Sequence, residues 1–119
     1  MICFKVADLG SMNRQLSSFL EYLENMHVNA DAVFDSRLIS CELITNALKH
    51  SGGVADFCGA IGEGEIVISV RSDSINKNIV VPQLPDALAE GGRGLYIVNE
   101  ISGGNVIISG GTVTVKLKI

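Results

Sequence analysis

The last eight residues of the chain alternate strictly between apolar and polar side chains. Because neighbouring side chains of a strand point to opposite faces, the segment 112–119 presents one apolar and one polar face. The apolar set is Val113, Val115, Leu117 and Ile119, and the polar set is Thr112, Thr114, Lys116 and Lys118. Such a strand belongs to a sheet that is covered on one side only. The pattern therefore favours a two-layer fold over a sheet buried on both faces.

Four more segments are predicted to be strands. The segments 54–61 and 65–71 form an antiparallel hairpin around Gly62-Glu63-Gly64, and Phe57 is its clearest core contact. The segment 106–109 pairs with the final strand through Gly110-Gly111, and 2–6 is a short strand or an extended arm.

Three helices complete the pattern. The first spans about 12–26, is capped by Ser11 and closes at His27; its apolar residues recur at helical spacing and are Met12, Leu16, Phe19, Leu20, Leu23 and Met26. The second is capped by Asn29 or Asp31 and ends at Ser51-Gly52-Gly53, and the third covers 94–101, with Leu95, Val98 and Ile101 facing inward. This order predicts an α/β two-layer sandwich (α+β), with helices on one face of a mostly antiparallel mixed sheet.

Length and charge limit the function classes. A chain of 119 residues forms a single domain spanning 1–119, and its net charge of −4 without a basic run argues against nucleic-acid or anionic-membrane binding. No apolar stretch approaches the roughly 20 residues that a membrane span requires. The N-terminus lacks the pattern of a signal peptide, so we expect a cytoplasmic protein. Since 47% of the residues are hydrophobic, a partner or a second copy is expected to cover part of the surface.

The cysteines give no metal motif. Cys3, Cys41 and Cys58 are odd in number, and their spacings match no metal site. We expect all three to be buried, reduced thiols.

A polar stripe runs along the second helix. Glu42, Asn46 and His50 follow one another at four-residue intervals, bordered by Ile39 and Leu43. The predicted deep face is Phe34, Leu38, Cys41, Ile44 and Leu48. A carboxylate and an amide among apolar neighbours need a partner, and a metal or a phosphate-bearing ligand is one candidate. A partly solvated face is the plainer explanation of the same spacing.

A glycine-rich segment precedes the third helix. In Gly91-Gly92-Arg93-Gly94-Leu95, the glycines allow close backbone approach, and the first helical N–H groups point toward a bound anion. The preceding connection, 72–91, contains Pro82 and Pro85 and is long enough to be functional.

Together, Glu42-x-x-x-Asn46-Ala47-x-x-His50 and Gly92-Arg93-Gly94-Leu95 resemble the N-box and the second glycine box of the GHKL (Bergerat-fold) ATPases. The size of the chain and the form of the motif are most similar to the anti-sigma factor serine/threonine kinases. The resemblance implies that Asn46 coordinates Mg²⁺, that Glu42 is the general base, and that the glycine box contacts the phosphates of ATP. His50 would either donate a hydrogen bond to the phosphates or contact the end of its own helix.

The first glycine box departs from this family pattern, Asp-x-Gly-x-Gly. Asp73 stands where the family has the aspartate that binds adenine, although a turn residue after a strand explains it equally simply. Ile75 and Lys77 occupy the two glycine positions, where a side chain would crowd the nucleotide. The resemblance therefore implies ATP and Mg²⁺ as cofactors, and this departure puts both in question.

Two functions follow from the resemblance. The first is an Mg-ATP-dependent serine/threonine kinase that binds a sigma factor, phosphorylates a small anti-anti-sigma protein and forms a homodimer. The second is a nucleotide-independent protein-binding module on a decayed ATPase fold. A relative of two-component kinases is less favoured, since 119 residues leave no room for a phosphoacceptor helix domain.

Overall fold

A computed structural model describes residues 1–51, 54–72 and 93–119. The side chains of His50, Ser51, Arg93 and Leu95 lie outside that description, although their backbone is helical. The elements in chain order are β1 (Ile2–Val6), α1 (Leu9–Asn25), α2 (Ala30–Ser51), β2 (Ala55–Gly62), β3 (Glu65–Arg71), α4 (Arg93–Ile101), β4 (Val106–Ser109) and β5 (Thr112–Lys118).

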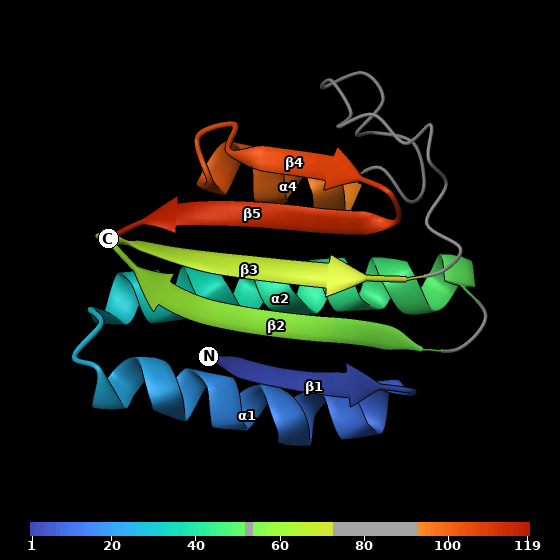
Figure 1. The fold of residues 1–119 in the computed structure, drawn as a ribbon, viewed down its shortest axis with the longest axis horizontal. Helices are drawn as coiled ribbons and strands as arrows, with labels where there is room; N and C mark the ends of the chain where they lie inside the picture. Colours follow the sequence, from blue (N-terminus) through green and yellow to red (C-terminus); the bar gives the residue numbers. More distant parts are fainter. Residues whose placement is uncertain (52–53, 73–92) are drawn as a thin grey trace.

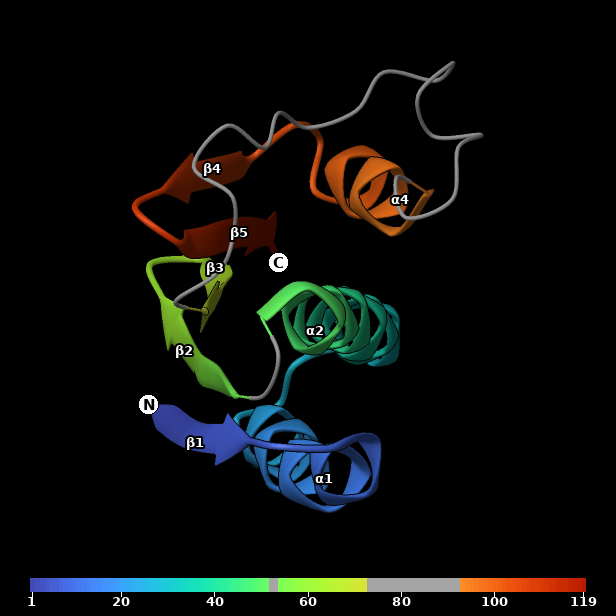
Figure 2. The same cartoon turned by 90° about the vertical axis from the view of Figure 1, so that its right-hand side faces the viewer.

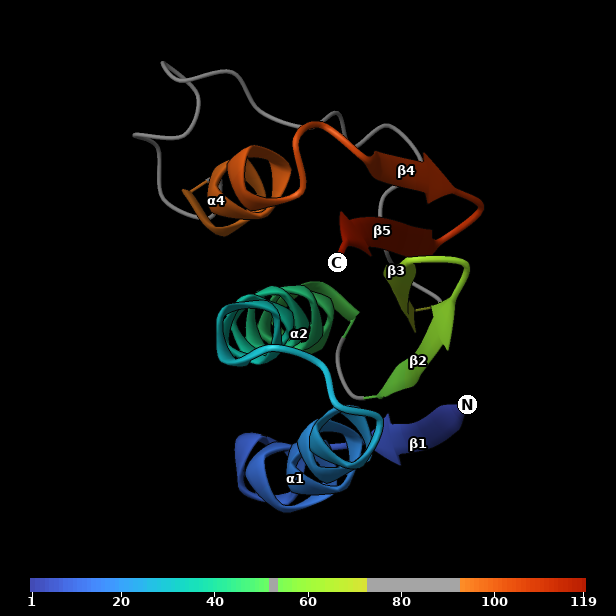
Figure 3. The ribbon, with the colours of Figure 1, turned by 90° about the vertical axis from the view of Figure 1, so that its left-hand side faces the viewer.

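The strands form one open sheet, with the helices on one of its faces. The strand order is β1-β2-β3-β5-β4, and every neighbouring pair is antiparallel. Figure 1 shows the strands in front of the helices, and the two side views separate the layers clearly (Figures 2 and 3). The predicted two-layer α+β arrangement is confirmed. The expected mixed character is not seen, because the five described strands pair only in the antiparallel sense.

Glycines set both hairpins. In the β2–β3 turn, Glu63 and Gly64 have φ values of 40° and 78°, which match the right-handed twist of the two strands. Between β4 and β5, Gly110 and Gly111 have φ values of 56° and 85°. The Ser72 N–H donates a 2.9 Å hydrogen bond to the Gly111 carbonyl, so this turn also holds the end of β3.

The core lies between the sheet and the helices and is centred on aromatic rings. Phe57 is fully buried, stacks on Phe4 at a centroid distance of 4.6 Å and meets Phe19 edge-on at 5.1 Å. Apolar residues that point inward from β3 and β5 fill the rest: Ile66, Ile68, Val70, Val113, Val115 and Leu117. Those of β5 are the ones that the alternation predicts. Ile119 is an exception to the predicted inward set, because it follows the end of β5 and is 45% exposed.

The helix starts were only partly predictable. Asp8, rather than Ser11, caps α1: its carboxylate accepts a 2.7 Å hydrogen bond from the Ser11 N–H, so the helix begins at Leu9. Asn29 caps α2, as one of the two predicted alternatives, through a 2.8 Å bond from the Ala32 N–H. His27 adopts a left-handed φ of 62° between the two helices and is exposed.

The buried face of α2 differs from the prediction. Phe34, expected at depth, is 66% exposed, and Met26 at the end of α1 is 56% exposed. Leu38, Cys41 and Leu48 are half-buried, and of the predicted face only Ile44 is fully enclosed. The face that packs inward consists of Ala32, Ser36, Ile39, Ser40, Leu43, Ile44 and Ala47. Ser36 and Ser40 interrupt the apolar pattern of this face, so apolar periodicity does not identify it as the buried face.

The cysteine prediction was wrong for two of the three residues. Cys3 and Cys58 form a disulfide across β1 and β2, with their α-carbons 4.2 Å apart. The strand register places these two residues directly opposite each other, which a sequence separation of 55 cannot reveal. Cys41 is free and half-buried.

Candidate functional site

The predicted site falls at the meeting of α2 and α4, which pack side by side on the covered face of the sheet. In Figure 1, α2 ends toward the right of the view, and α4 begins on that same side and runs back to the left. The two helices therefore run in opposite directions. As a result, the half of α2 that carries Glu42 and Asn46 lies toward the start of α4 rather than toward its end.

Glu42 and Asn46 are both half-buried on α2. Side chains four residues apart on a helix are neighbours, with their β-carbons about 5–6 Å apart. Leu43 and Ala47, which follow them, are buried, so the two polar groups stand at the border of the core. The predicted border residue Ile39 is also fully buried.

Two buried hydroxyls lie deeper on the same helix. Ser36 and Ser40 are fully buried, and neither hydroxyl forms a hydrogen bond with any group in the described part of the chain. A fully buried hydroxyl without a partner is costly, so these serines make the N-terminal half of α2 less favourable than an all-apolar helix.

The second half of the predicted site is described only in part. Arg93 and Gly94 form the first turn of α4, and their backbone N–H groups are among those a helix leaves unpaired at its start. This turn carries no acidic residue that would compete for an anion. The side chains of His50, Arg93 and Leu95 lie outside the described part of the chain. The residues Gly92, Asp73, Ile75 and Lys77, and with them the first glycine box, lie outside it entirely.

The donor set suits a hard cation held by few protein ligands. The amide oxygen of Asn46 and the carboxylate of Glu42 are oxygen donors of the type that Mg²⁺ accepts, and Mg²⁺ usually keeps several waters. In the ranges 1–51, 54–72 and 93–119, no group of three or more His, Cys, Asp or Glu side chains is placed to hold a metal.

Two ionisable groups near these helices have shifted pKa values. Burial raises the pKa of the Cys41 thiol, and the neighbouring Glu42 carboxylate adds to the rise, whereas the charge and hydrogen bond of Arg37 oppose it. On α4, desolvation of the half-buried ring and then the Glu100 carboxylate one turn on raise the pKa of Tyr96. Both groups are neutral at pH 7, so Cys41 adds no charge beside Glu42.

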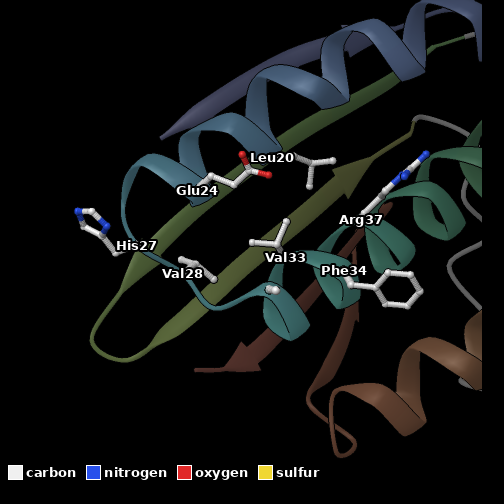
Figure 4. A pocket seen from close by; sticks show the side chains of 8 residues that line it. Leu20, Glu24, His27, Val28, Val33, Phe34 and Arg37 are labelled. Carbon is white, nitrogen blue, oxygen red and sulfur yellow. The ribbon is translucent and has the colours of Figure 1, made fainter.

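A separate groove lies between the end of α1 and the start of α2. It has a volume of about 710 Å³, and Figure 4 shows Leu20, Val33 and the exposed Phe34 along it, with Glu24 and Arg37 carrying its charges. His27, Val28 and Ala30 complete its lining. The groove is not predictable from a sequence pattern that places Phe34 in the core.

A second hollow opens on the uncovered face of the sheet. Its volume is about 570 Å³, and it contains the Cys3–Cys58 disulfide together with Lys5, Asp56 and Arg71. The remaining lining residues are Phe4, Phe57, Ser69 and Thr112. The sequence held a signal for it, since Cys3 and Cys58 each alternate with core residues and so point away from the core.

Neither a protein-family model nor a curated protein matches this sequence. Within the described ranges, no helix combines the length and the apolar character needed to cross a membrane.

Proposed function

We propose that the chain is an Mg-ATP-dependent serine/threonine kinase of the Bergerat type that acts on a small protein partner. The observation that carries the proposal is the placement of Glu42 and Asn46 on the part of α2 that lies toward the glycine-containing start of α4. The family motifs predict that these two elements share one nucleotide site. The two-layer antiparallel architecture is the second support.

In this proposal each residue has one role. The Glu42 carboxylate accepts the proton of a serine hydroxyl on the partner protein. The hydroxyl oxygen then forms a bond to the γ-phosphorus, the bond from that phosphorus to the β–γ bridging oxygen breaks, and ADP leaves. Asn46 contributes an oxygen ligand, and the N–H groups of the first turn of α4 bind phosphate oxygens. Mg²⁺ held there would offset part of the charge of the phosphates. Asp73 would bind adenine and His50 a phosphate.

The proposed partners come from the same resemblance. A sigma factor would be the bound target, and a small anti-anti-sigma protein would be the substrate. The apolar groove that includes Phe34 is a surface on which such a contact would leave the nucleotide site free.

The first experiment is a thermal denaturation series with Mg-ATP and Mg-ADP. A ligand at 100 times its Kd adds about 2.7 kcal/mol, which raises the midpoint of a domain of this size by several degrees. We expect a magnesium-dependent rise that is lost in Asn46→Ala and kept in Asn13→Ala, because Asn13 is an exposed asparagine on α1. Glu42→Ala should keep the rise but lose phosphoryl transfer, with Glu21→Ala as its exposed control.

A second candidate is a protein-binding module without nucleotide chemistry. The observation that favours it is the replacement of both glycines of the first glycine box by Ile75 and Lys77. On this reading, millimolar nucleotide leaves the thermal midpoint unchanged, and Glu42→Ala binds partners as the native chain does. A nucleotide-dependent change in partner affinity would contradict it.

A further inference from the structure

We propose that the Cys3–Cys58 disulfide is a thiol–disulfide exchange site, open to small anionic thiols of the glutathione class, on the uncovered face of the sheet. This site is separate from the proposed nucleotide site, which lies on the other side of the sheet among the helices. The proposal does not depend on the kinase function.

The position of the bond makes it accessible. Cys3 is exposed and lies on β1, which is an edge strand paired to β2 alone. Cys58 is half-buried on β2. Attack by an external thiolate is therefore directed to the Cys3 sulfur, with Cys58 as the leaving group. Exposed disulfides are generally easier to reduce than buried structural ones.

The strand register places two cationic residues near the disulfide. Asp56 lies between Lys5 on β1 and Arg71 on β3, which are its partners in the sheet. Asp56 precedes Cys58 by two residues, so all three side chains share the face of the sheet that carries the disulfide. Two positive charges and one negative charge leave a local excess of one. Ser69 stands directly opposite Cys58 on β3, so its hydroxyl is placed to donate to a Cys58 thiolate. Positive charge and a hydrogen-bond donor both stabilise a leaving thiolate.

The hollow supplies room for the incoming molecule. Its volume of about 570 Å³ matches the range of small-molecule sites, and the disulfide and both cations line it. A thiol that carries carboxylates would meet Lys5 and Arg71 on approach. This charge match is the reason to specify an anionic thiol rather than a neutral one.

The exchange balances in two steps. In the first, the thiolate of one external molecule forms a bond to the Cys3 sulfur, the Cys3–Cys58 bond breaks, and Cys58 leaves as a thiolate that takes up a proton. In the second, another external thiolate forms a bond to the external sulfur of the mixed disulfide, the bond from that sulfur to Cys3 breaks, and Cys3 leaves as a thiolate that takes up a proton. The two external thiols are oxidised to their disulfide, and the protein gains two electrons and two protons.

The test follows both directions of exchange in a Cys41→Ser background, which leaves only the proposed pair. The folded protein is incubated with reduced or oxidised glutathione, remaining thiols are alkylated with N-ethylmaleimide, and intact masses are recorded while circular dichroism monitors folding. We expect two alkyl groups to be gained without loss of structure. In single-cysteine variants, oxidised glutathione should modify Cys3 in Cys58→Ser at least about fivefold faster than Cys58 in Cys3→Ser, in line with thiol access.

A charge comparison supplies the control. Arg71→Gln should slow reduction by glutathione roughly two- to fourfold more than reduction by neutral 2-mercaptoethanol, because only the first reagent is attracted electrostatically. Arg14→Gln, a change at an exposed residue of α1, should leave both rates unchanged. The proposal is overturned if the bond neither forms nor breaks until denaturant unfolds the chain, or if Arg71→Gln slows both reagents equally.

Discussion

The ring of Phe19 on α1 lies directly over the α-carbon of Gly59 on β2. A β-carbon placed on Gly59 would stand 2.7 Å from Cζ of Phe19 and 2.9 Å from Cδ1. Phe19 is fully buried and also packs edge-on against Phe57, so neighbouring side chains restrict the movement of its ring. The contact fixes how closely the first helix approaches the sheet.

Gly59→Ala should therefore lower the free energy of unfolding by about 1–3 kcal/mol, the usual cost of overpacking a core. Urea denaturation measures the change. Gly62→Ala, at the end of the same strand, is the matched control, because a β-carbon there meets no atom within 4 Å. Adding Phe19→Leu to Gly59→Ala should recover part of the loss. Equal effects of the two alanine variants would show that the close approach is not the cause.

The corrected face of α2 predicts a clear contrast between two apolar residues. Ile39→Ala removes a fully buried side chain and should cost roughly 2–5 kcal/mol of unfolding free energy. Phe34→Ala removes a side chain that is 66% exposed and should change stability by less than about 0.5 kcal/mol. Chemical denaturation of the two variants side by side decides which face is inward. A larger loss of unfolding free energy for Phe34→Ala would show that the face predicted from the sequence is the buried one.

The disulfide predicts a stability difference between the oxidised and reduced chain. A cross-link between residues separated by 55 positions restricts the unfolded chain, and the chain-entropy estimate for such a loop is about 4 kcal/mol. We expect a loss of about 2–4 kcal/mol on reduction, measured as a lower denaturation midpoint. The double variant Cys3→Ser/Cys58→Ser should show that lower midpoint in both the presence and the absence of reductant. A reductant effect that persists in this variant would assign the loss to something other than the bond.

The half-buried thiol of Cys41 predicts how stability changes at alkaline pH. Because burial raises the pKa of Cys41 above its ordinary value, the thiol ionises more readily in the unfolded chain than in the folded one. Its contribution to stability is complete below the ordinary thiol pKa of about 8.5 and is lost as pH rises through the higher, folded value. Urea midpoints from neutral to alkaline pH should therefore fall more steeply in the native chain than in Cys41→Ala. An equal fall of the urea midpoint with pH in the two chains would contradict the raised pKa of Cys41.

Local patterns in the sequence predicted most of the fold. Alternation identified the inward residues of β5, apart from Ile119, and glycines identified both hairpin turns, since each depends on neighbouring residues alone. The predictions failed where tertiary contacts determine which residues are buried. Ser36 and Ser40 pack inward against the apolar preference, so the orientation of α2 could not be read from hydrophobicity.

The candidate site was predictable to a smaller extent. The spacing of Glu42 and Asn46 placed them on one side of a helix, and both are half-buried there. The packing of α4 beside α2 could be known only from the folded structure. The disulfide required more still, because the pairing of Cys3 with Cys58 depends on the register of two strands that are far apart in the chain.

The strand order has a consequence for shortened forms of this chain. The last described strand, β5, lies inside the sheet between β3 and β4, so β3 depends on a partner strand that lies more than 40 residues further along the chain. A product that stops before Thr112 would leave seven residues of β3 without their partner, including the β-branched residues Ile66, Val67, Ile68 and Val70. An unpaired apolar edge of this kind recruits other strands. Prematurely terminated or proteolysed copies should therefore aggregate, and deletion of β4 and β5 should turn a folded domain into a seed for intermolecular sheets.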